Sequence, residues 1–201
     1  MVKKIFSVPG RMWRRKIRLR KLKKEWLSDE LLSNEFKLAE LKLAMPFLEH
    51  LNKKTIRGYK IDVIKAKHEA KIGIILRKGR RGFAIDRLNI VDNLGKRLVS
   101  VEELQGTLYE SKYDCRDREK LRKLQKGFNE KAGIPWAQFL LQISLDAAWK
   151  AGYDGIRVIR AEKHPLFRKY RADLFRGLYD WNANKVGIRK KEGNYWVLYF
   201  P

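Results

Sequence analysis

Three short runs rich in β-branched residues lie close together in the first half of the chain, over residues 59–64, 71–76 and 83–91. Runs of this length, bounded by polar and glycine residues, are typical of β-strands. Strands that follow one another through short connections usually pair antiparallel. We therefore expect the core of the protein to contain a sheet that begins with these three strands.

The connection between the second and third runs combines glycine with positive charge. Residues 77–82 have the sequence Arg-Lys-Gly-Arg-Arg-Gly, in which the glycines allow a tight turn and the cations are expected to point outward. We interpret this turn as a candidate contact for phosphate groups. The alternative is an ordinary solvated basic turn.

The C-terminal third has the most regular pattern. A mostly apolar stretch over 136–149 follows Pro135 and ends before Gly152, as in a helix with proline in its first turn and glycine beyond its last. A strand is predicted over 155–161, a further helix over about 171–185, and a terminal hairpin over 187–200. Together with the earlier runs, these elements predict an α+β or α/β protein with a mixed, largely antiparallel sheet flanked by helices.

A separate helix is expected before the sheet. Ser28 followed by Asp29 and Glu30 predicts a helix start, because a serine side chain caps free N–H groups and acids complement the dipole of the first turn. Apolar residues then keep a helical spacing to about residue 52, with Pro46 as a kink or a break. This apolar stripe is expected to pack on the core, or alternatively to dock a partner protein.

The remaining segments are polar or strongly basic. Residues 92–134 are rich in polar and turn-forming residues, and we expect an insertion there with a basic helix over about 114–126. The predicted organisation is a basic N-terminal arm over 1–27, an amphipathic helical segment over 28–54, and a core over 55–201. The arm is expected to become helical when its charges are neutralised; a solvated disordered tail and a transit peptide are the alternatives.

The charge of the chain is its main clue to function. The sequence carries 47 Lys and Arg against 23 Asp and Glu, a formal net charge of +24, and 11 of these cations fall within the first 24 residues. Solubility alone needs a net charge of only about 2 to 8 in a small domain, and a larger excess repels itself unless anions neutralise it. We therefore expect a polyanionic partner, RNA or DNA, and a non-enzymatic role in a nucleoprotein assembly.

Aromatic residues stand beside several of the basic clusters, as in Phe83 after the turn at 77–82. Rings stack on unpaired bases while cations contact phosphate, which favours RNA. The predicted nucleic-acid-binding residues are Arg11, Arg14, Arg15, Lys16, Arg18, Arg20, Lys21, Arg77, Lys78, Arg80, Arg81, Arg116, Arg118, Arg122, Lys123, Arg168, Lys169, Tyr170 and Arg171.

The order helix, strand, helix and aromatic hairpin resembles the second half of the GCN5-related N-acetyltransferase (GNAT) fold. The sequences Ala-Ala-Trp-Lys-Ala-Gly-Tyr-Asp-Gly-Ile over 147–156 and Leu-Tyr-Asp-Trp-Asn-Ala-Asn-Lys-Val-Gly-Ile over 178–188 carry the resemblance, which covers about residues 56–200. It implies an alternative function, an acyltransferase that uses acetyl-CoA on an RNA-bound or tRNA-linked amine, with Tyr179 in the general-acid place. The family's pyrophosphate-binding turn, Gln/Arg-x-x-Gly-x-Gly/Ala, is replaced by residues 125–135, which lack its glycine spacing.

Other chemistry has less support in the sequence. His164, before Pro165, is a candidate base at the end of a strand, and a loop histidine without a role is the alternative. None of the three histidines lies at metal-ligand spacing from Cys115, so we expect no metal and no cofactor apart from acetyl-CoA under the alternative. A single cysteine and the lack of a long apolar run predict a cytoplasmic or organellar protein without a membrane partner.

Overall fold

The computed structural model describes residues 34–51, 58–66, 70–106, 117–167 and 171–201, with residues 34–41 described by their backbone alone. The chain divides into two compact units, Met1–Met45 and Pro46–Pro201. Helix α2 (Asn34–His50) spans the boundary between them. It continues past Pro46 rather than ending there, whereas its predicted start at Ser28 and the basic arm lie outside the described residues.

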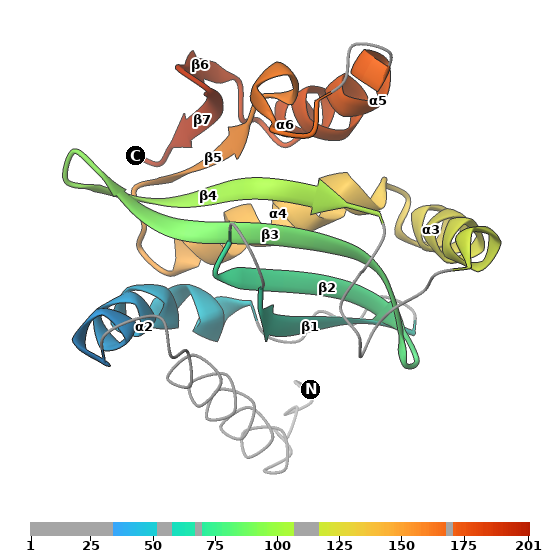
Figure 1. The fold of residues 1–201 in the computed structure, drawn as a ribbon, viewed down its shortest axis with the longest axis horizontal. Coiled ribbons are helices and arrows are strands. Elements are labelled where there is room, and N and C mark those ends of the chain that lie inside the picture. The colour runs from blue at the N-terminus through green and yellow to red at the C-terminus, as the bar shows by residue number, and fades with distance from the viewer. Residues whose placement is uncertain (1–33, 52–57, 67–69, 107–116, 168–170) are drawn as a thin grey trace, which may run out of the picture. The chain divides into compact units, whose positions relative to one another are not determined.

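The second unit is built on one seven-stranded sheet (Figure 1). Its strands are β1 (Tyr59–Lys65), β2 (Ile72–Lys78), β3 (Arg81–Asn93), β4 (Lys96–Gln105), β5 (Gly155–Ile159), β6 (Lys190–Glu192) and β7 (Tyr195–Tyr199). The spatial order is β1-β2-β3-β4-β5-β7-β6, and only β4 and β5 pair in parallel. The predicted α+β class with a mixed, largely antiparallel sheet is confirmed.

Strands β1, β2 and β3 form where the sequence predicts them. The turn between β2 and β3 passes through Gly79, whose φ of 60° lies in the left-handed region that glycine adopts without strain. Alternate residues of the three strands pack on each face of the sheet, and one cluster joins Ile75 and Ile85 with Ile64.

Strand β4 is missing from the sequence prediction, because it lies inside the polar segment expected to be an insertion. Its residues over 98–101 are buried, but its two ends carry Lys96, Arg97, Glu102 and Glu103. These charges hide the short apolar pattern in the middle. The segment over 92–134 is therefore not an insertion, since it supplies the central strand that pairs with both β3 and β5.

Two helices connect β4 to β5. Helix α3 (Arg118–Ala132) begins four residues later than predicted, because the carboxylate of Asp117 accepts hydrogen bonds from the backbone N–H groups of Glu119 and Lys120. Helix α4 (Trp136–Lys150) matches its prediction and buries most of its apolar side chains. It lies behind the sheet in the view of Figure 1.

The helix predicted over about 171–185 is present as a continuous run of helical turns. After the short turn η1 (Ala161–Lys163), the chain forms α5 (Ala172–Arg176), the π-helical stretch η3 (Gly177–Trp181) and α6 (Asn182–Lys185). The predicted strand over 155–161 is two residues too long, because Ala161 begins η1. The terminal hairpin of β6 and β7 is confirmed.

Helices α4 and η3 contact the same face of the sheet, which we call the helical face. Ser144 of α4 donates a hydrogen bond to Asp86 of β3, and the indole N–H of Trp196 in β7 donates one to Asp180 of η3. Residues that neighbour Asp86 and Trp196 along their strands point to the opposite face. This assignment decides which side chains of β5 and β7 can meet a ligand.

Candidate functional site

Many of the predicted nucleic-acid contacts fall outside the described residues. These are Arg11, Arg14, Arg15, Lys16, Arg18, Arg20, Lys21, Arg116, Arg168, Lys169 and Tyr170. The others lie in the turn between β2 and β3, on α3, and at Arg171, which is exposed just before α5.

The basic turn between β2 and β3 contains two kinds of cation. Arg77 does not point outward as predicted, because its guanidinium forms an ion pair with Asp62 on β1 and donates a hydrogen bond to the carbonyl of Gly79. Lys78, Arg80 and Arg81 are exposed. Arg77 therefore stabilises the turn, and its three neighbours are the ones available to an anion.

Helix α3 lies at the same end of the sheet as this turn (Figure 1), and it adds a further cation there. The Nζ atoms of Lys78 and Lys131 lie 5.5 and 5.9 Å from the ring centre of the buried Tyr59. Two lysines that are 53 positions apart in the sequence thus flank one tyrosine. We call Lys78, Arg80, Arg81 and Lys131 the basic end. Lys131 is not among the residues predicted from the sequence, because only the packing of α3 on the sheet brings it there.

The other predicted cations of α3 are arranged along its exposed side. Lys123 forms an ion pair with Glu119 at 2.5 Å, and both side chains are mostly exposed. Arg118 and Arg122 are exposed and form no ion pair with the described residues. Because they are four positions apart on a helix, these two arginines lie on one side of it.

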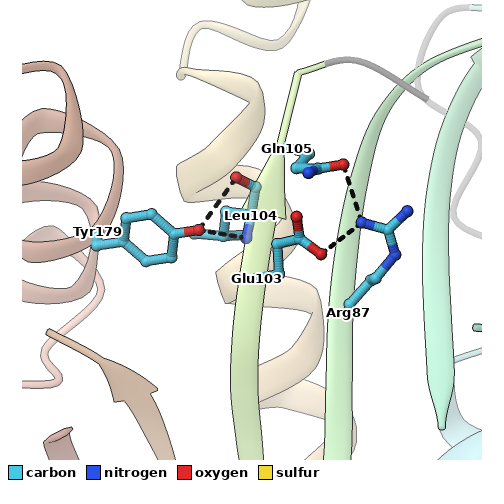
Figure 2. Close-up of polar contacts among 5 residues, drawn as sticks. All are labelled: Arg87, Glu103, Leu104, Gln105 and Tyr179. Carbon is cyan, nitrogen blue, oxygen red and sulfur yellow. Dashed lines mark hydrogen bonds and ion pairs between the residues drawn. The ribbon is translucent and has the colours of Figure 1, made fainter. Parts of the chain in front are cut away.

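A buried polar cluster surrounds the end of β4 (Figure 2). The hydroxyl of Tyr179 accepts a hydrogen bond from the backbone N–H of Leu104 at 3.1 Å and lies 3.4 Å from its carbonyl oxygen. Strand β5 pairs with β4 only over residues 98–101, so Leu104 lies beyond that pairing and Tyr179 supplies its partner. Burial raises the pKa of the Tyr179 hydroxyl well above its usual value, although the hydrogen bond with Leu104 opposes this.

On the other side of β4, Arg87 joins two acceptors. Its Nη1 atom lies 2.5 Å from a carboxylate oxygen of Glu103 and 2.9 Å from the amide oxygen of Gln105. The bulge that places Glu103 opposite Arg87 leaves Glu102 as the extra residue of β4. Figure 2 shows Tyr179 and Arg87 approaching this strand from opposite sides.

Asp86 is the second buried polar group near this strand. One carboxylate oxygen accepts a hydrogen bond from Ser144 at 2.7 Å, and the other has no hydrogen-bond partner among the described residues. Burial raises the pKa of Asp86 to about 7, and the hydrogen bond from Ser144 lowers it in part. The sequence gives no signal for this residue, since an aspartate within a β-run is usually solvated.

The two candidate catalytic residues are brought together. The rings of His164 and Tyr179 lie 5.0 Å apart, and Phe175 packs against both. The Nδ1 atom of His164 accepts a hydrogen bond from the backbone N–H of Leu166. His164 and Tyr179 are only 7% and 1% exposed, so this pair forms part of an aromatic cluster rather than an open site.

The segment that replaces the pyrophosphate-binding turn, residues 125–135, lies between the starts of helices α3 and α4. Most of the segment over 125–135 is helix, because residues 125–132 form the second half of α3. At the start of α3, two backbone N–H groups already donate to the Asp117 carboxylate, whose negative charge opposes a phosphate there. At the start of α4, the N–H of Trp136 donates to Asn129. At both helix starts, backbone N–H groups that a pyrophosphate would use therefore already donate to acceptors of the protein itself.

The part of the chain that the structure describes shows neither a metal-ligand cluster nor a membrane-spanning helix. Within it, no group of three or more His, Cys, Asp or Glu side chains is placed to hold a metal ion. None of its helices is long and apolar enough to cross a bilayer. A scan against protein-family models found no matching family, and a search of curated proteins found no match.

Proposed function

We propose that this protein binds single-stranded RNA, mainly through phosphate contacts, and serves as a non-enzymatic component of a ribonucleoprotein assembly. The observation that carries the proposal is the basic end, where β2, β3 and α3 gather four cations. It adds a folded surface to the charge of the arm. Phosphates spaced along a strand suit cations spread over neighbouring elements.

The distribution of charge supports a polyanionic partner. Beyond residue 24 the chain keeps 36 Lys and Arg against all 23 acids, so the excess does not belong to the arm alone. Ion pairs such as that of Lys123 with Glu119 are exposed and contribute only about 0.2 to 1 kcal/mol each. Such weak pairs release their cations to phosphate at little cost.

The salt dependence of RNA binding tests the proposal. We expect the affinity for a generic labelled single strand, measured by fluorescence anisotropy, to fall by orders of magnitude between about 50 and 200 mM salt. A variant with Arg80→Ala, Arg81→Ala and Lys131→Ala should lower the slope of log affinity against log salt by about 0.7 for each phosphate that it no longer neutralises. The slope falls because each phosphate that stays unneutralised keeps its counterion.

A matched variant separates this surface from the total charge. Lys185→Ala also removes an exposed cation, but Lys185 lies on α6 beside Trp181, outside the basic end. Its slope should stay close to that of the wild type. Salt-insensitive binding would count against the basic end as the RNA contact. So would an equal loss of slope per charge removed in the triple variant and in Lys185→Ala.

An acyltransferase remains the second candidate. It is favoured by the position of Tyr179, whose hydroxyl meets the backbone of β4 just beyond the parallel pairing of β4 with β5. The segment over 125–135 counts against it. Saturating acetyl-CoA should raise the melting temperature if this function is correct, and an unchanged melting temperature would remove it.

A further inference from the structure

Strand β7 places two tyrosines on one side of the sheet. Tyr195 and Tyr199 are four positions apart, and side chains alternate along a strand, so both point to the same face. Trp196 between them points to the helical face, where it bonds to Asp180. The two tyrosines therefore lie on the face opposite α4 and η3.

Tyr195 carries an arginine over its ring. Arg157 is the residue of β5 that pairs with Val197, which puts it on the same face as Tyr195. Its Cζ atom lies 4.0 Å from the ring centre of Tyr195, and its Nε atom donates to the hydroxyl of Ser100 at 2.7 Å. The hydrogen bond to Ser100 thus helps to hold the Arg157 guanidinium over the ring of Tyr195.

Tyr199 is flanked by two lysines. The Nζ atoms of Lys96 and Lys190 lie 4.3 and 5.3 Å from its ring centre, and its hydroxyl donates to Glu192 at 2.8 Å. Lys96 belongs to β4 and Lys190 to β6, so strands from both sides of β7 contribute. Tyr195 and Tyr199 are both half-buried, whereas both lysines are exposed, and Lys190 also forms an ion pair with Glu192 at 2.6 Å.

We propose that these five residues, Lys96, Arg157, Lys190, Tyr195 and Tyr199, form a stacking platform for unpaired bases of RNA. This inference rests on the proposed function and names a second contact surface for the same ligand. Rings and a guanidinium plane supply stacking, while the lysines at the rim meet the phosphates that connect successive bases. The basic end supplies charge, and the platform supplies recognition of the bases themselves.

The aromatic residues that neighbour cations in the sequence are different ones. Phe83, for example, follows Arg80 and Arg81 in the chain, but it is fully buried. Tyr195 and Tyr199 acquire their cations from β4, β5 and β6 only through strand pairing. If the two rings had a purely structural role, replacing them would lower the stability of the protein but would not change its preference for RNA that carries bases.

Binding to RNA with and without bases tests the platform. The full chain is titrated with a labelled single strand and with an abasic ribose-phosphate strand of equal length, at one salt concentration. The ratio of the two affinities reports stacking. We expect Tyr199→Leu to lower this ratio by about fivefold or more, since stacking on one ring contributes about 1 to 3 kcal/mol per base. Tyr199→Phe keeps the ring and should keep the ratio.

The control variant is Lys191→Ala. Lys191 lies on strand β6 and pairs with Trp196, so its side chain points to the helical face of the sheet, away from the platform. It should lower both affinities by one factor and leave the ratio unchanged. If Tyr199→Leu keeps the wild-type ratio of the two affinities, the platform is overturned, but the proposal that the protein binds RNA is not. Absence of RNA binding by the wild type overturns the proposed function and the platform together.

A crosslinking measurement does not depend on any variant being folded. The wild-type protein is irradiated with RNA that contains 4-thiouridine, and crosslinked peptides are identified by mass spectrometry. We expect a base crosslinked to the peptide that holds Tyr195 and Tyr199. Crosslinks confined to the arm or to the basic end overturn the platform.

Discussion

At the scale of single residues, Asp86 couples the stability of the fold to pH. Burial raises its pKa to about 7 in the folded protein from an ordinary value of 3.8. Between these values the folded protein keeps a proton that the unfolded chain has released, so the free energy of unfolding falls as the pH rises from about 4 to about 7. The fall levels off above pH 7 and amounts to about 4 kcal/mol, at 1.36 kcal/mol per pKa unit.

The variant Asp86→Asn removes this titration and keeps an oxygen for the Ser144 hydroxyl. We expect its stability relative to the wild type to increase from about pH 4 to 7 and then to stay constant, as measured by urea unfolding. Ser144→Ala is the companion variant: it removes the hydrogen bond that lowers the pKa, so the wild-type decline should extend to higher pH. A pH-independent difference between Asp86→Asn and the wild type would contradict the raised pKa.

At the scale of elements, β5 depends on a glycine where it enters the sheet. A Cβ atom on Gly155 would lie 2.4 Å from the backbone oxygen of Leu198 in β7 and 3.1 Å from a methyl group of Leu98 in β4. The Leu98 methyl group can rotate away, but the backbone oxygen of Leu198 cannot retreat without moving strand β7. We expect Gly155→Ala to lower the free energy of unfolding by about 2 to 3 kcal/mol, measured by denaturant unfolding.

Gly177→Ala is the matched control for that substitution. Gly177 has helical backbone angles, and a Cβ atom on it would have no neighbour within 4 Å. Alanine there should be neutral or stabilise the protein by up to about 1 kcal/mol. Equal losses of stability for the two variants would show that the close approach of Leu198 to Gly155 is not the reason why β5 needs a glycine there.

At the scale of the whole molecule, the positive charge is divided between the arm and the rest of the chain. Residues 1–24 hold 11 of the 47 cations and no acid, and the remaining 36 cations are accompanied by all 23 acids. A chain that lacks residues 1–24 should therefore still bind RNA in the salt titration, with a smaller slope because fewer counterions are released. Complete loss of binding on this deletion would place all phosphate contacts in the arm and exclude the basic end and the platform.

The elements that can be predicted from the sequence are those whose pattern is local. The β-branched runs of β1 to β3, the apolar helix α4 between Pro135 and Gly152, and the final hairpin all follow from spacing within a few residues. The cationic excess is also a property of composition alone. By contrast, the polar ends of β4 concealed its buried centre, and the cap formed by Asp117 moved the start of α3.

Which side chains meet depends on the folding of the whole chain and cannot be predicted from local patterns. Strand pairing brings Arg157 onto Tyr195, and helix packing brings Lys131 beside Tyr59. On the side of β4 that faces β5, the hydroxyl of Tyr179 takes the place of a strand partner for Leu104. Each of these contacts joins residues that are far apart in the chain, and their partners depend on the register of the sheet and on the direction in which helices return to it. A periodic pattern records which face of an element is buried, but it does not record what lies against that face.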